Sequence, residues 1–260
     1  MRTKTNAAFL AFSWLGIAVG SLAILDTARA EDFRVENAVY VGSEKEPRVE
    51  STTIFCSGVV YDYLKSPAEI TVFDRGNHRF ILLDVTRRVK TEVPTDKVSS
   101  LCQHLKTWAT GQKDPLLAFL ANPRFNEAFD PATGKLTLSS ETVTYDLATM
   151  NVENSEISQE YREFSDWYCQ LNTLLNPGSR PPFARMAVNA ALDRHQRFPE
   201  QVDLALRLSG FPAKRLTIRS EHQLIRRLVE SDRGRIAQTD QYLAIFTPAP
   251  LDEYQKKILQ

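Results

Sequence analysis

Histidine, cysteine and glycine are scarce in this chain, and their scarcity limits the chemistry that it can carry. The 260 residues include four histidines, three cysteines and ten glycines. The histidines lie far apart, and none belongs to an HxH or HExxH metal motif. The glycines mark turns, so a phosphate-binding loop and a Gly-x-Ser-x-Gly nucleophile elbow are both missing. We therefore expect no cofactor, no bound metal and no catalytic motif of a familiar class.

An excess of charge of one sign is also absent. Lysine plus arginine and aspartate plus glutamate both number 32, so the formal net charge is zero. A neutral chain has no general electrostatic attraction for nucleic acid. We expect no nucleic-acid partner.

The one long apolar run lies at the N-terminus. Basic residues at Arg2 and Lys4 precede an apolar stretch over 7–25, and Ala28-Arg29-Ala30 fits a signal-peptidase site. This pattern predicts a signal peptide over 1–30 and export to the periplasm or the extracellular space. An uncleaved membrane anchor is the alternative, because the stretch is long enough to span a bilayer.

The chain after this segment has the length of one domain. No later stretch is apolar enough to cross a membrane, and no linker or repeat divides the sequence. We expect residues 31–260 to form a single domain with a substantial core.

The cysteines leave two interpretations open. Cys56 falls on a predicted strand, and Cys102 and Cys169 fall on predicted helices. Export permits a disulfide, but three cysteines leave one unpaired. They are either three small buried side chains, or Cys102 and Cys169 form a bridge between two helices.

The segment 50–93 predicts a β-meander around which the domain is organised. Alternating apolar and polar residues and intervening turn residues indicate strands at 51–64, 69–74 and 79–93. The first strand is apolar on both sides, so other elements must cover both of its faces. A sheet between helices or an open barrel would satisfy this requirement.

The remaining segments predict a mixture of helices and strands. Helical spacing indicates helices at 95–110, 115–121 and 125–129, one capped by Ser158, one opened by Pro181 and Pro182, one from about Ser231, and a short terminal helix. Strands are expected at 33–41, in a hairpin over 136–147, and at 200–208. The alternation resumes after the Gly210-Phe211-Pro212 turn and continues to about Leu228. This order predicts an α+β fold with a curved, mainly antiparallel sheet and helices packed on one face of it.

The two meander segments Val59-Val60-Tyr61-Asp62-Tyr63-Leu64 and Ile81-Leu82-Leu83-Asp84, together with the signal peptide, the later hairpin and the apolar helices, resemble the lipoprotein-carrier (LolA-like) superfamily. The resemblance implies an open half-barrel whose concave face is covered by helices and holds acyl chains. This chain lacks the helix expected directly after the signal peptide, and the segment 95–130 is an insertion. No ligand-contacting residue carries over by motif.

Three functions follow as hypotheses. The first is a non-enzymatic exported protein that binds a lipid or a lipoprotein acyl chain between sheet and helices. The second is an envelope scaffold or interaction protein without a ligand cavity. The third is a hydrolase of unrecognised type, for which Glu221 and His222 form the tentative polar site, because His222 shares a strand face with Ser220.

Basic residues gather in the segment 207–235. The cations are Arg207, Lys214, Arg215, Arg219, Arg226, Arg227, Arg233 and Arg235, against Glu221, Glu230 and Asp232. The segment is either a solvated sheet face or a patch that binds anionic lipid head groups or acidic glycans.

Overall fold

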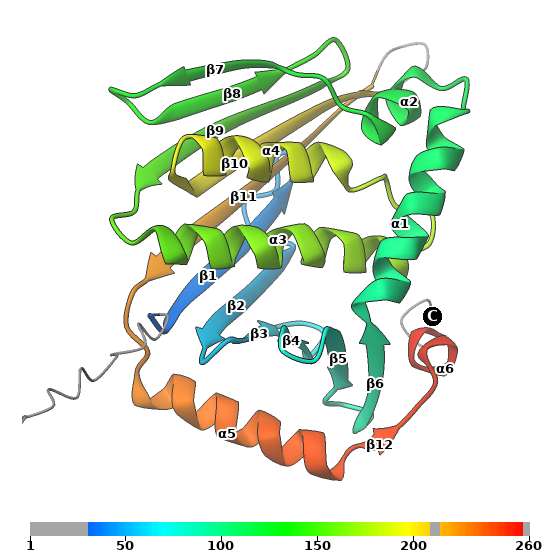
Figure 1. Cartoon of the computed structure of the whole chain (residues 1–260), viewed down its shortest axis with the longest axis vertical. Helices are drawn as coiled ribbons and strands as arrows, with labels where there is room; N and C mark the ends of the chain where they lie inside the picture. Colours follow the sequence, from blue (N-terminus) through cyan, green and yellow to red (C-terminus); the bar gives the residue numbers. More distant parts are fainter. Residues whose placement is uncertain (1–30, 209–213, 257–260) are drawn as a thin grey trace, which may run out of the picture.

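The computed structural model describes residues 31–208 and 214–256, which form an α+β fold built on one large sheet (Figure 1). The predicted signal peptide and the Gly210-Phe211-Pro212 turn lie outside the described residues. The strands are β1 (Phe33–Val41), β2 (Val49–Cys56), β3 (Val59–Leu64), β4 (Glu69–Asp74), β5 (Arg79–Asp84), β6 (Val89–Pro94), β7 (Asn126–Asp130), β8 (Lys135–Ser139), β9 (Val143–Asn151), β10 (Arg197–Leu208), β11 (Lys214–Ile225) and β12 (Thr247–Pro248). The helices are α1 (Thr95–Thr110), α2 (Pro115–Ala121), α3 (Ser155–Leu175), α4 (Phe183–Arg194), α5 (Glu230–Ile245) and α6 (Leu251–Gln255).

The strands join in a single open sheet of order β12-β6-β5-β4-β3-β2-β1-β11-β10-β9-β8-β7. All neighbours are antiparallel except β12 and β6. Two meanders, β2–β6 and β7–β11, meet where β1 pairs with β11 from Arg34↔Ile225 to Val41↔Ile218. The expected α+β class and mainly antiparallel sheet are therefore confirmed.

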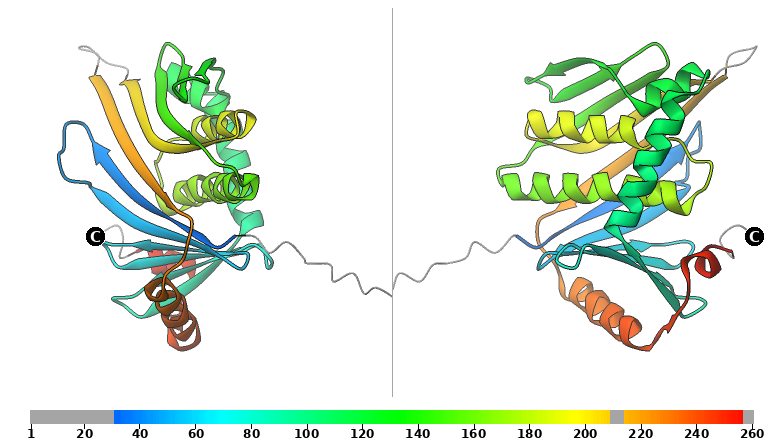
Figure 2. Two further views of the ribbon diagram at one scale, coloured as in Figure 1. Left: turned by 90° about the vertical axis from the view of Figure 1, so that its left-hand side faces the viewer. Right: turned by 45° about the vertical axis from the view of Figure 1, so that its right-hand side comes forward.

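Helices cover both faces of the sheet, so the prediction that they pack on one face is wrong. The helices α3 and α4 lie side by side against one face, and α1 crosses the end of α3 (Figure 1). The helix α5 packs against the other face of the β2–β6 meander (Figure 2). None of the helices in the described part of the chain is long and apolar enough to cross a membrane.

Two layers of side chains explain why the meander is apolar on both faces. On β2, Phe55 joins the core beneath α3, where its ring meets that of Phe164 edge-on at 5.8 Å. The preceding residue, Ile54, joins the core beneath α5 together with Phe246. Adjacent residues of a strand face opposite sides, so the meander fills two cores. A third core lies under α2 and α4, on the face of β8–β10.

Two of the predicted meander strands are each divided by a turn. The expected strand 51–64 is β2 and β3, joined at Ser57-Gly58, where both residues adopt positive φ (52° and 80°). The expected strand 79–93 is β5 and β6, joined by 85–88, with Arg88 at φ 55°. In the second turn Asp84 accepts a hydrogen bond from the backbone N–H of Arg87 at 2.7 Å. This local bond favours a turn over continued strand.

Several element boundaries and roles differ from the prediction. The segment expected as a helix at 125–129 is the edge strand β7, because its backbone pairs with β8. The cap of α3 is Asn154 and not Ser158, since the Asn154 side chain accepts from the N–H of Glu156. The strand expected to continue to about Leu228 is β11, which ends at Ile225.

The cysteines are all free thiols, and no bridge joins Cys102 and Cys169. Burial raises the pKa of Cys102 to about 11 and that of Cys169 to about 12. The first interpretation of the cysteines, as small side chains packed in the structure, agrees best with this arrangement. Cys102 is buried, whereas Cys56 and Cys169 are half-buried. The Cys56 thiol lies 3.5 Å from the carboxylate of Asp32.

Candidate ligand-binding groove

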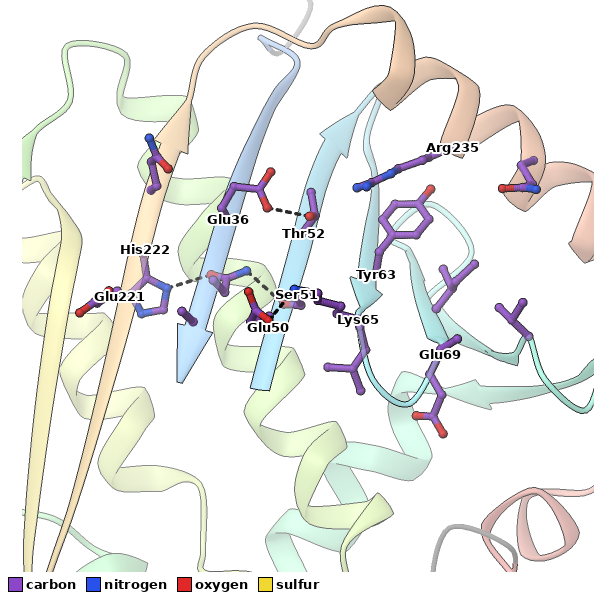
Figure 3. Close-up of a pocket in the computed structure, with 18 of the residues that line it drawn as sticks. Glu36, Glu50, Ser51, Thr52, Tyr63, Lys65, Glu69, Glu221, His222 and Arg235 are labelled. Carbon is purple, nitrogen blue, oxygen red and sulfur yellow. Dashed lines mark hydrogen bonds and ion pairs between the residues drawn. The ribbon is translucent and has the colours of Figure 1, made fainter. Parts of the chain in front are cut away.

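A groove of about 830 Å³ lies between α5 and the sheet (Figure 3). Strands β1 to β4 and β11 form its floor, and α5 forms one wall. Its lining combines apolar and aromatic side chains with carboxylates. The principal lining residues are Glu36, Ala38, Glu50, Thr52, Tyr63, Leu64, Glu69, Ile70, Val85, Glu200, Glu221, Arg235 and Tyr242.

Polar contacts fasten the helix wall to the sheet. Arg34 on β1 donates to the carboxylate of Asp232 at 2.6 Å. The hydroxyls of Tyr63 and Thr239 lie 3.0 Å apart, and Thr239 is fully buried. The ammonium group of Lys90 donates to the backbone carbonyl of Leu243 near the other end of α5. The wall is therefore tied down along its length and the groove has a fixed width.

The charge of the groove is predominantly negative. Five carboxylates line it, against the cations of Lys65 and Arg235. Lys65 is already paired with Glu50 at 2.8 Å, and the Arg235 guanidinium lies 5.8 Å from the centre of the Tyr63 ring (Figure 3). Burial, followed by the neighbouring Asp84, raises the pKa of Glu69. A cationic group would relieve this concentration of carboxylates.

A chain of buried hydrogen bonds runs across the opposite face of the same strands. Tyr168 of α3 donates to Asp62 at 2.9 Å, and Thr53 donates to the other oxygen of Asp62 at 2.7 Å. The side-chain amide of Asn37 donates to Thr53 at 2.9 Å, and its oxygen lies 2.8 Å from Nδ1 of His222. Burial raises the pKa of Asp62. This chain holds β1, β2, β3 and β11 in register behind the groove.

The structure separates the two residues of the tentative polar site. Because successive side chains of a strand alternate, Glu221 and His222 leave opposite faces of β11. The Glu221 carboxylate pairs with Arg219 at 3.2 Å, on the side of the groove. The His222 ring lies against Tyr161 of α3, with 3.3 Å between the Tyr161 hydroxyl and Nδ1. The two side chains therefore do not form an acid–base pair.

The environment of His222 does not suit a catalytic base. Its Nε2 lies 3.1 Å from the Ser220 hydroxyl and its Nδ1 faces Asn37, an order that resembles nucleophile, base and orienting residue. However, burial, together with the nearby Arg185, lowers the pKa of His222 to about 3. A general base works best when its pKa lies near the working pH. Ser220, His222 and Asn37 therefore form a structural hydrogen-bond network in which the imidazole nitrogens have partners.

We searched the described residues for side chains that could bind a metal ion together. Within 31–208 and 214–256, no group of three or more His, Cys, Asp or Glu side chains could hold a metal ion. This observation concerns the protein ligands alone.

Sequence reasoning missed most of the residues that shape the groove. The carboxylates of Glu36, Glu50 and Glu69 come from three different strands, and no sequence spacing links them. Asp62 of the buried network could have been found from the sequence, since it interrupts the apolar run of β3.

A scan of the chain against protein-family models and a search of curated proteins both found no match.

Proposed function

We propose that the protein is an exported, non-enzymatic binding protein, and that its ligand lies in the groove between α5 and the sheet. The groove carries the proposal, because about 830 Å³ falls within the usual size of a small-molecule site. Export follows from the sequence pattern of residues 1–30. The resemblance to lipoprotein carriers supports a lipid-like ligand.

The face beneath α3 is a poorer place for a ligand. Aromatic rings fill it, including the stacked pairs Phe33–Phe55 and Phe73–Phe80, with centroids 4.2 Å and 4.6 Å apart. An acyl chain there would have to displace fully buried side chains. We therefore place the ligand on the α5 side.

The groove lining indicates the chemistry of the ligand. Ile70, Val85 and Tyr242 offer an apolar surface toward α5. Glu36 on β1 accepts from Thr52 at 2.7 Å and lies 3.4 Å from Arg34, and Glu221 on β11 is paired with Arg219 (Figure 3). Glu69 and Glu200 also line the groove and form no ion pair within the described residues. A ligand with a hydrocarbon part and a positively charged group would satisfy both regions. We propose a lipid or acylated molecule that carries an ammonium group.

Native mass spectrometry of protein purified from its own envelope tests this function. The wild-type protein should carry a co-purified, lipid-sized adduct. The substitution Ala38→Trp places a large ring on the groove floor and should remove the adduct. Ala148→Trp is the matched control, because Ala148 lies on the same face of the sheet and outside the groove lining.

The outcomes separate clearly. An adduct in wild type and Ala148→Trp that is missing from Ala38→Trp supports binding in the groove. Repeated absence of any adduct from the wild-type protein contradicts the function. An adduct of equal occupancy in both tryptophan variants contradicts its location.

A further inference from the structure

Two arginines face each other on neighbouring strands, and neither has an acidic partner among the residues that the structure describes. In the β10–β11 ladder Arg207 lies directly opposite Arg215, and both residues are exposed. Within the described chain, neither side chain forms a hydrogen bond, ion pair or cation–π contact. Like charges directly opposite on an antiparallel pair are destabilising. The folded protein thus tolerates repulsion at this position.

A second hollow opens beside this pair. Its volume is about 550 Å³, and its lining includes Lys45, Arg215 and Arg219. The Arg219 guanidinium lies 4.3 Å from the centre of the Tyr40 ring, which holds it flat against the sheet. Three cations therefore line the hollow beside three carboxylates, and Arg207 faces Arg215 from the neighbouring strand without lining the hollow itself.

Three carboxylates also line this hollow, and one of them is in an ion pair. Glu44 is paired with Arg48. Asp146 accepts a hydrogen bond from Thr137 at 2.8 Å, and Asp203 accepts one from Gln201 at 2.6 Å. Within the described residues, no ion pair balances the charge of Arg207 or Arg215, while Asp146 and Asp203 accept only from these neutral donors.

We propose that a phosphate group binds at the edge of this hollow, held between Arg207 and Arg215. A phosphate monoester carries close to two negative charges near neutral pH, which matches two unbalanced guanidinium groups. Each guanidinium presents a planar fork that fits phosphate oxygens with two parallel hydrogen bonds. The group belongs either to a soluble phosphate ester or to a lipid head group.

This site is separate from the groove of the proposed function and does not depend on it. The pair formed by Arg219 and Glu221 stands between the two hollows, with Arg219 in the lining of one and Glu221 in the lining of the other. Failure of either site leaves the other untouched.

The test is a binding titration of the full mature chain with two probes. Glycerol 3-phosphate represents the soluble ester, and phosphatidylcholine vesicles containing phosphatidic acid represent the lipid. The double variant Arg207→Glu/Arg215→Glu should weaken binding at least tenfold. The matched control Arg226→Glu/Arg227→Glu makes the same charge change at two exposed arginines near the other end of β11 and should bind like wild type.

A single variant distinguishes weaker binding from loss of the folded state. Arg207→Glu replaces the repulsive pair by an opposite-charge pair, so it should raise Tm by roughly 1–4 °C while still weakening binding of the preferred probe. Binding of glycerol 3-phosphate that the double variant abolishes supports a soluble ester, and binding of vesicles alone supports a lipid head group. Binding to neither probe, or equal losses in both double variants, overturns the proposal.

Discussion

Arg34 of β1 and Asp232 of α5 form a buried ion pair that joins the first strand of the fold to the wall of the groove. The Arg34 guanidinium donates to the Asp232 carboxylate at 2.6 Å, and Asp232 is 1% exposed. The same carboxylate accepts from the backbone N–H of Val229 at 2.9 Å, at the start of α5. One side chain therefore caps the helix and fixes it to the sheet.

Replacing Asp232 by alanine should destabilise the protein by about 3 kcal/mol, because it leaves a partly buried guanidinium and an uncapped helix. Urea unfolding at pH 7 measures this loss. Asp240→Ala on the exposed side of α5 is the control, and it should stay within about 0.5 kcal/mol of wild type. A loss below about 1 kcal/mol for Asp232→Ala would show that the pair does not hold the helix.

His222 should make the stability of the protein sensitive to acid. Its folded pKa of about 3 lies below the ordinary value of 6.5, so its contribution is complete above pH 6.5 and is lost as the pH falls toward 3. Between pH 7 and pH 4, wild type should lose about 3 kcal/mol more stability than His222→Gln, which cannot take up the proton. Urea unfolding of both proteins at each pH gives this difference.

The comparison between these two proteins removes other titrations, since the buried Asp62, whose pKa is raised, is present in both. His104→Gln replaces an exposed histidine of α1 and should follow the wild-type profile. Parallel curves for wild type and His222→Gln would contradict a neutral, buried His222.

Tyr168→Phe should destabilise the protein by roughly 1.5–3 kcal/mol, because it removes a donor from the buried Asp62 carboxyl group. Chemical unfolding at pH 7 measures the effect. Tyr40→Phe makes the same chemical change at a half-exposed position, where the hydroxyl lies 3.4 Å from Glu221. Its cost should stay under about 0.5 kcal/mol, and equal costs for the two variants would argue against the buried network.

Gly134 sits where any side chain would strike the sheet. Its φ is +72°, and a Cβ atom would lie 2.5 Å from the backbone oxygen of Thr149 and closer still to the Arg197 guanidinium. Gly134→Ala should therefore lower stability by at least about 2 kcal/mol more than Gly178→Ala. Gly178 has φ +87° with no atom within 4 Å of an added Cβ. Thermal unfolding of the two variants decides, and similar melting temperatures would contradict the close approach.

Sequence periodicity predicted the elements that have one polar and one apolar side. The strand at 33–41 and the helix at 95–110 match β1 and α1, because each has a distinct buried face. The helix at 115–121 matches α2, although its sequence PLLAFLA has no polar side. Periodicity did not predict the turn at Ser57-Gly58, because β2 and β3 are largely apolar on both faces and the apolar pattern continues through the turn. The pairing of β7 with β8 is a tertiary effect that overrides the helical spacing of Phe125 and Phe129.

Helix α1 shows the same limit in reverse. Trp108 recurs at helical spacing with Val98, Leu101, Cys102 and Leu105, yet its side chain is 52% exposed, whereas Val98 and Cys102 are buried. Helical spacing does not reveal how far along a helix the covering elements reach. The groove likewise depends on which strands pair. Glu36 and Glu50 could be placed in one groove only once the β1–β2 pairing was known.

Hydrogen–deuterium exchange of the protein as purified from its envelope, before and after extraction of bound molecules with detergent, tests ligand binding in the groove most directly. Extraction should speed exchange in peptides from α5 and from 63–70, which line the groove, and leave peptides from α3 unchanged. Faster exchange confined to α3 and α4, or identical exchange before and after extraction, would contradict a ligand between α5 and the sheet.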